Sequence, residues 1–146
     1  MTDEGTGNSA DAAHAGLEKW ILGSNGTWTL AYTLMCGLIG KIDSDLAGYD
    51  GQYTDVTTIG LRNLTGSVNK NGTVTLWAAT STSSASGDNG ADPNRIVEIT
   101  DEVTATTLTG KVASETFRTI AGPSYGTVYR GVAYVGSGTQ DHGPGW

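Results

Sequence analysis

The stretch that decides the fold is Leu61-Arg-Asn-Leu-Thr-Gly-Ser-Val68, followed by Asn69-Lys-Asn-Gly72 and Thr73-Val-Thr-Leu-Trp-Ala-Ala-Thr80. The two flanking segments are short and rich in Thr, Val and Leu, a composition that favours strands. An Asn-Gly pair at 71–72 is a strong signal for a tight turn between antiparallel strands. This stretch therefore predicts a β-hairpin.

Strand-like segments of the same kind lie on both sides of this hairpin. Trp28, Leu30 and Tyr32 alternate with polar or small residues, and Asn25-Gly26 precedes them as a second hairpin turn. No segment shows a sustained helical period. We expect further strands at residues 17–22, 28–34, 95–100, 116–120 and 128–135, and an all-β, antiparallel fold.

The composition limits the class of protein. The chain has 146 residues, which suits one domain, and 22 glycines and 22 threonines, which suit turns and strands. Its net charge of −7 argues against nucleic acid or an anionic membrane as the main partner. We expect residues 1–16 to be a flexible tail, 17–136 the folded domain, and 137–146 a second, Gly-rich tail.

The sequence also repeats internally. Residues 17–20 match 96–99 in pattern, and 61–64 match 129–132, with Arg62 and Arg130 at equivalent positions. One unit then has four strands over about 61–121, with the last two strands of a preceding unit before it and the first strand of a following unit after it. A repeating four-stranded unit is typical of a β-propeller blade.

Several of these segments together carry a resemblance to a known group of proteins. They are Leu17-Glu-Lys-Trp, Gly26-Thr-Trp-Thr-Leu-Ala-Tyr-Thr-Leu, Gly60-Leu-Arg-Asn-Leu-Thr-Gly, Val74-Thr-Leu-Trp-Ala-Ala-Thr-Ser, Asn94-Arg-Ile-Val-Glu-Ile-Thr-Asp and Tyr129-Arg-Gly-Val-Ala. Their pattern resembles the C-terminal blades of exported, functionally uncharacterised β-propeller proteins of microbes, over about residues 17–136. The resemblance implies a propeller fold and an extracellular or secreted setting, and it implies no catalytic residues.

The chain has strands for about two blades, whereas a closed propeller ring contains about 4–8 blades. Exposed blade faces and open strand edges favour association. We therefore expect a homo-oligomer in which copies complete a ring, with a small sandwich as the alternative.

Three sets of residues are candidates for binding. Asp43, Asp45 and Asp50 lie in an acidic loop that half-resembles a calcium site, and a solvated loop is the alternative. Arg62 and Arg130 would recur around a propeller axis and bind an anion or acidic sugar, with ion pairs as the alternative. Tyr49, Tyr53 and Tyr125 fall in loops, where they are candidates for stacking on sugar rings. The aromatic residues on strands are expected mostly in the core.

Signals for catalysis are weak. Gly122-Pro-Ser-Tyr-Gly126 fits G-x-S-x-G, and Asp141 and His142 follow it. That motif needs a strand before the serine and a helix after it, so we interpret it as a turn. Cys36 is the only cysteine, which leaves no intrachain disulfide and no spaced partner for zinc. No cofactor is expected apart from the calcium alternative.

These observations predict an extracellular binding or interaction module of β-propeller type, with carbohydrate as the ligand class considered. The alternatives are a hydrolase or lyase acting at the propeller axis and a structural, self-assembling unit.

Overall fold

A computed structural model describes residues 1–6, 15–41, 57–83, 92–124 and 126–136. Within these ranges the fold is all-β, and its one helical turn is the 3-10 turn η1 at Val112–Ser114. The strands form two antiparallel sheets. The expected all-β, antiparallel class is confirmed at this level. The strands are β1 (Thr2–Asp3), β2 (Gly16–Leu22), β3 (Trp28–Leu34), β4 (Gly40–Lys41), β5 (Thr57–Val68), β6 (Thr73–Ser83), β7 (Ile96–Glu102) and β8 (Arg118–Ala121).

Both sequence-predicted hairpins are present. Gly26 and Gly72 have φ angles of 79° and 82°, which glycine adopts without the steric cost of a Cβ. In each turn a backbone amide bonds back across the loop, from Gly23 to the carbonyl of Thr27 and from Asn69 to the carbonyl of Thr73. Local turn chemistry therefore fixes the register of the β2–β3 and β5–β6 pairs.

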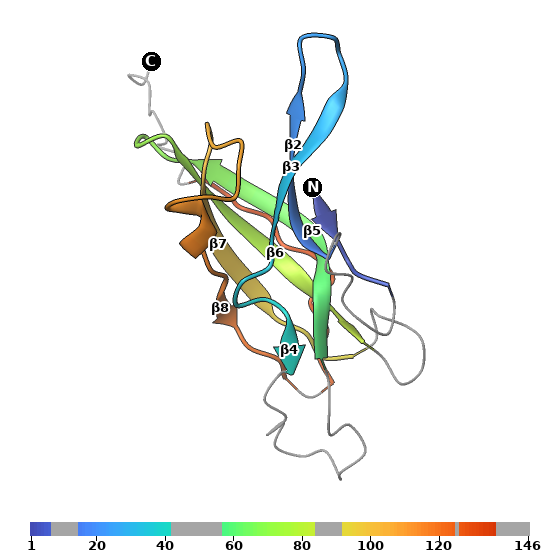
Figure 1. The fold of residues 1–146 in the computed structure, drawn as a ribbon. Helices are drawn as coiled ribbons and strands as arrows, with labels where there is room; N and C mark the ends of the chain where they lie inside the picture. The colour runs from blue at the N-terminus through green and yellow to red at the C-terminus, as the bar shows by residue number, and fades with distance from the viewer. Residues whose placement is uncertain (7–14, 42–56, 84–91, 125, 137–146) are drawn as a thin grey trace, which may run out of the picture.

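The larger sheet has the order β4-β5-β6-β7-β8, so β5 to β8 form a meander of consecutive strands. This matches the four-stranded unit expected over residues 61–121. The smaller sheet has the order β1-β2-β3. Figure 1 shows the β2–β3 hairpin extending beyond the body of the molecule.

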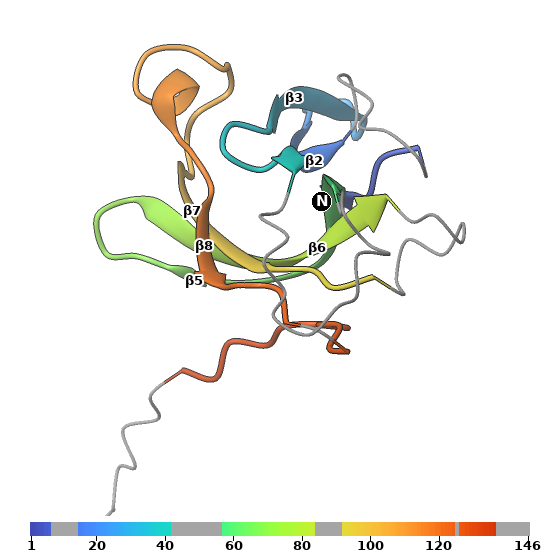
Figure 2. The ribbon, with the colours of Figure 1, turned by 90° about the horizontal axis from the view of Figure 1, so that it is seen from below.

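The β5–β8 sheet is covered on both sides. In Figure 2 the β2–β3 hairpin lies against one side, here called the inner face, and the chain after β8 runs along the other, the outer face. The core on the inner face includes residues of both sheets and of the β7–β8 connection. Its fully packed members are Leu17, Tyr32, Leu34, Leu38, Leu61, Ala78, Val97, Ile99, Val112 and Phe117.

Two expectations about the chain ends were wrong. Residues 2–3, placed in a flexible tail, pair with β2 as strand β1, and a Cβ on Gly60 of β5 would lie 2.8 Å from the Cα of Glu4. Residues 128–135, expected to be a strand, have no strand assignment. Their backbone is bonded by side chains of the outer face instead, as described below.

The described ranges contain no helix long and apolar enough to cross a membrane.

Candidate functional site

Two exposed tryptophans lie close together on the β2–β3 hairpin and line one groove. Trp20 on β2 is 37% exposed, and Trp28 on β3 is 59% exposed. Together with Met1 they line an open groove of about 500 Å³, here called the tryptophan groove. A contiguous exposed aromatic surface that lines a groove is typical of an interaction or ligand-binding site.

The hairpin geometry explains this exposure. Trp20 pairs with Leu30 in the ladder, and Leu22 pairs with Trp28, so all four lie in the distal half of the hairpin. That half extends beyond the larger sheet (Figure 1), which leaves it no sheet to pack against. The indole Nε1 of Trp20 donates a 2.9 Å hydrogen bond to Oε2 of Glu18, which fixes the orientation of the ring.

A second cavity, here called the inter-sheet cleft, shares Trp20 and Met1 with the tryptophan groove. Its volume is about 400 Å³. It lies between the β2–β3 hairpin and the end of the β5–β6 hairpin, and most of its lining is apolar. The lining residues are Met1, Leu17, Glu18, Lys19, Trp20, Leu34, Leu64, Val68, Val74, Leu76, Asp101 and Val103.

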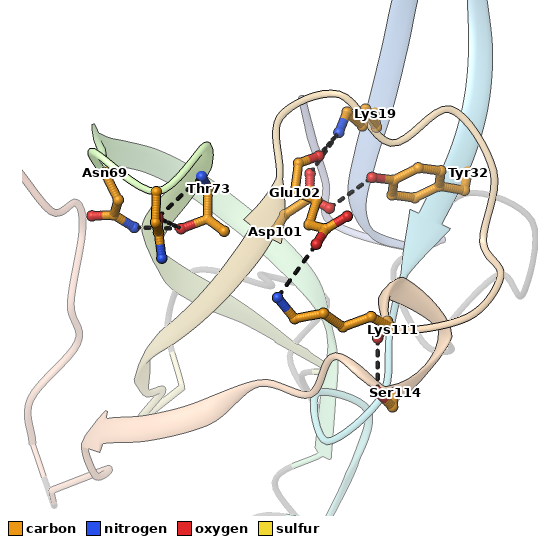
Figure 3. A network of polar contacts seen from close by, with 9 residues as sticks. Lys19, Tyr32, Asn69, Thr73, Asp101, Glu102, Lys111 and Ser114 are labelled. Atoms are coloured by element: carbon orange, nitrogen blue, oxygen red, sulfur yellow. Dashed lines mark hydrogen bonds and ion pairs between the residues drawn. The ribbon is translucent and has the colours of Figure 1, made fainter.

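Polar groups of the cleft link the two sheets (Figure 3). Asp101 on β7 is 5% exposed and accepts two side-chain hydrogen bonds. One comes from the hydroxyl of Tyr32 at 2.6 Å, and the other from Nζ of Lys19 at 3.0 Å. The Lys19 ammonium also donates to the backbone carbonyl of Glu102 and lies 5.3 Å from the ring centre of Tyr32. Pairing makes burial of the Asp101 charge tolerable.

Ionisation is perturbed around Asp101. Burial, with the carboxylate of Asp101 second, raises the pKa of Glu115 from 4.5 to about 7. Burial and the hydrogen bond to Asp101 also raise the pKa of Tyr32. Clustered carboxyl groups with a shifted pKa often mark a functional site. Here both oxygens of Asp101 already accept bonds from Tyr32 and Lys19, so the cluster serves to hold the sheets together.

The combined groove and cleft suit binding. A pyranose ring presents a face of C–H groups that stacks on an indole ring, and carboxylate or ammonium groups nearby accept or donate hydrogen bonds to its hydroxyls. Trp20 and Trp28 supply the stacking surfaces. Glu18 and Lys19 lie in the lining of the adjoining inter-sheet cleft, whereas Asp101 in that lining is already bonded to Tyr32 and Lys19.

The two repeat-equivalent arginines have different environments. Nε of Arg62 lies 2.8 Å from Oε2 of Glu4, and both side chains are partly exposed. Arg62 also lines a shallow hollow that contains Asp3 and Glu4, an acidic setting that disfavours an anion. This supports the ion-pair alternative for Arg62. Arg130 is exposed in the segment after β8, and an anion site there stays a prediction.

The remaining sequence candidates lie outside the described residues. These are the calcium candidates Asp43, Asp45 and Asp50, the loop tyrosines Tyr49, Tyr53 and Tyr125, and the Asp141-His142 pair. Among the residues that are described, no group of three or more His, Cys, Asp or Glu side chains could hold a metal ion. Ser124 lies in an isolated bridge with Thr127, which agrees with a turn at the G-x-S-x-G motif.

Sequence reasoning missed both tryptophans of the groove, because it assigned strand aromatics mostly to the core. Period-2 alternation identifies one face of a strand but not whether that face is covered. The available signal was their position next to the Asn25-Gly26 turn, since residues near a hairpin tip have few neighbours.

Comparison with protein-family models, with curated proteins and with solved structures found no match to this chain.

Proposed function

We propose that the chain is an extracellular binding module of β-propeller type that takes carbohydrate in the tryptophan groove. The single observation that carries the binding part is the pair of exposed rings, Trp20 and Trp28, that line one open groove. Two stacking surfaces on one hairpin fit successive sugar units better than a single small molecule. A neutral saccharide also suits a protein of net charge −7, because its binding needs no basic surface.

Support for the propeller part of the proposal comes from the arrangement around the β5–β8 meander. Its inner face packs against β2–β3, and its outer face against the chain after β8 (Figure 2). The sequence repeats assign these two segments to the preceding and the following unit. Face-to-face stacking of neighbouring units is what a propeller requires. The extracellular setting rests on the sequence resemblance.

The experiment is a titration with neutral oligosaccharides of four linkage types: cello-, xylo-, chito- and malto-hexaose. Intrinsic tryptophan fluorescence reports binding. We expect saturable binding to at least one of them, and a loss of at least about fivefold in affinity for Trp28→Ala, because stacking on one ring contributes about 1 kcal/mol or more.

Two controls accompany the titration. Trp28→Phe keeps an aromatic face and should restore most of the affinity, whereas Leu108→Ala changes a comparably exposed apolar residue (46%) outside the groove and should bind as the wild type does. Because Trp28 is exposed, its replacement should leave the melting temperature nearly unchanged. The proposed site would be refuted if Trp20→Ala and Trp28→Ala both bound the oligosaccharide as strongly as the wild type does.

A further inference from the structure

The outer face of the β5–β8 sheet binds an extended segment of chain, residues 127–136, here called the arm. Asn94 makes the central contact. Its Oδ1 accepts a 2.7 Å hydrogen bond from the backbone amide of Tyr129, and its Nδ2 donates a 2.9 Å bond to the carbonyl of Tyr129. Asn94 is only 2% exposed, and its Nδ2 also donates to the carbonyl of Thr80. A buried amide therefore pairs with the arm as a neighbouring strand would.

Two side chains of β5 continue this pairing along the arm. Oδ1 of Asn63 accepts a 2.7 Å hydrogen bond from the amide of Val132, and Oγ1 of Thr65 accepts a 3.1 Å bond from the amide of Tyr134. Gly131 lies directly over Asn63, whose amide atoms would be 3.5–3.6 Å from a Cβ at that position. The sheet thus recognises the backbone of an extended chain, without a strand ladder.

An aromatic contact adds to these hydrogen bonds. The ring of Tyr134 stacks on Trp77, with centroids 4.9 Å apart and planes inclined by 10°. Trp77 is held in place because its Nε1 donates a 2.8 Å bond to Glu98, which also accepts a 2.6 Å bond from Arg118. The position of Trp77 therefore does not depend on the arm.

The arm itself is weakly integrated into the fold. Most of its residues are exposed, including Tyr134 at 47% and Val135 at 86%, and none belongs to the core cluster. Residues 122–126, a short connection that includes Pro123, join it to β8. Releasing the arm costs a few hydrogen bonds and one stack. Rebinding the same arm from another molecule restores all of them, which is the condition for exchange of a segment between protomers.

We propose that the seat formed by Asn63, Thr65, Trp77 and Asn94 is a self-association site that takes the arm of a second copy of this chain. The contact is heterologous, since the arm of one copy meets the sheet of the next, so it generates either a closed ring or a chain of copies. A short connection, such as that between β8 and the arm, favours binding of the arm to another copy over rebinding to its own chain.

Cys36 makes a direct test possible, because it is the only cysteine and it is exposed. Two batches of the full chain are labelled at Cys36, one with a donor and one with an acceptor fluorophore, and then mixed at increasing concentration. We expect energy transfer that rises with concentration, and that an unlabelled peptide of residues 127–136 suppresses. Tyr134→Ala removes the stack from the closed and the exchanged form alike, so it should speed the appearance of energy transfer about three- to tenfold, because exchange first requires release of the arm.

Matched variants separate this surface from other causes of association. Val135→Ala, one residue from Tyr134 and more exposed, should associate as the wild type does. Trp28→Ala in the tryptophan groove should also associate normally, which separates this proposal from carbohydrate binding. No energy transfer at any concentration overturns the proposal. So does transfer that the peptide does not reduce and whose rate is the same in Tyr134→Ala as in the wild type.

Discussion

Glu115 gives the clearest prediction at the scale of a single residue. Burial and Asp101 raise its pKa from 4.5 to about 7, so the folded chain holds a proton that the unfolded chain has released over this interval. The free energy of unfolding should therefore fall as the pH rises from about 4.5 to about 7, with no further loss from this group above that range. Glu115→Gln should remove this part of the pH dependence.

The measurement is the urea midpoint of both proteins at intervals between pH 5 and pH 8. The groups that face Glu115 and Asp101 are Lys19, Tyr32, Glu102 and Lys111, and all are retained in the variant. Wild-type protein should lose stability relative to Glu115→Gln across the interval. Parallel curves would show that Glu115 titrates at its ordinary pKa.

The exposure and the contacts of individual side chains were the least predictable features of the candidate site. Trp20 and Trp28 were assigned to the core because strand periodicity does not report which face a neighbour covers. Asp101 carried no motif, and its partners Lys19 and Tyr32 are 82 and 69 residues away in sequence. Such contacts depend on how two sheets pack, which no local pattern encodes.

At the scale of elements, the strand β5 leads to a paired prediction. Leu61 is 1% exposed in the core cluster, whereas Val68 near the other end of the same strand is 77% exposed. Leu61→Ala should lower the free energy of unfolding by about 2–5 kcal/mol, because it removes buried methyl groups and leaves a cavity. Val68→Ala should change it by less than about 0.5 kcal/mol.

Chemical denaturation of both variants checks this pair. Equal losses in Leu61→Ala and Val68→Ala would contradict the assignment of buried and exposed positions along β5.

Elements fixed by local chemistry were predicted well. The β2–β3 and β5–β6 hairpins were identified from their turns and alternation, and the start and end of β3 agree with the sequence prediction. The short strands β1 and β4 were missed, because two-residue strands exist only through pairing with distant partners. The arm has the alternation of a strand but lies over the face of a sheet, where side chains take the place of a strand partner.

At the scale of the whole molecule, the two sheets share one core. Leu17, Tyr32 and Leu34 from the smaller sheet pack in the same cluster as Leu61 and Val97 from the larger one. The chain should therefore unfold in a single cooperative transition, and far-ultraviolet and near-ultraviolet circular dichroism should give the same midpoint. Two separated midpoints would show that the β2–β3 hairpin detaches before the β5–β8 sheet unfolds.

The class of fold could be predicted from the sequence because all-β, antiparallel structure follows from composition, turns and alternation. The segments that precede and follow the meander in sequence lie on its two faces (Figure 2).

The central claim is that the tryptophan groove binds carbohydrate, and nuclear magnetic resonance of the indole N–H groups tests it most directly. The chain has four tryptophans, so single Trp→Phe variants assign the four signals. On titration with the hexaose that binds best, the account predicts that the signals of Trp20 and Trp28 shift together and saturate, while that of Trp77, covered by Tyr134, stays in place. Unchanged Trp20 and Trp28 signals at saturating concentrations of all four hexaoses would contradict it.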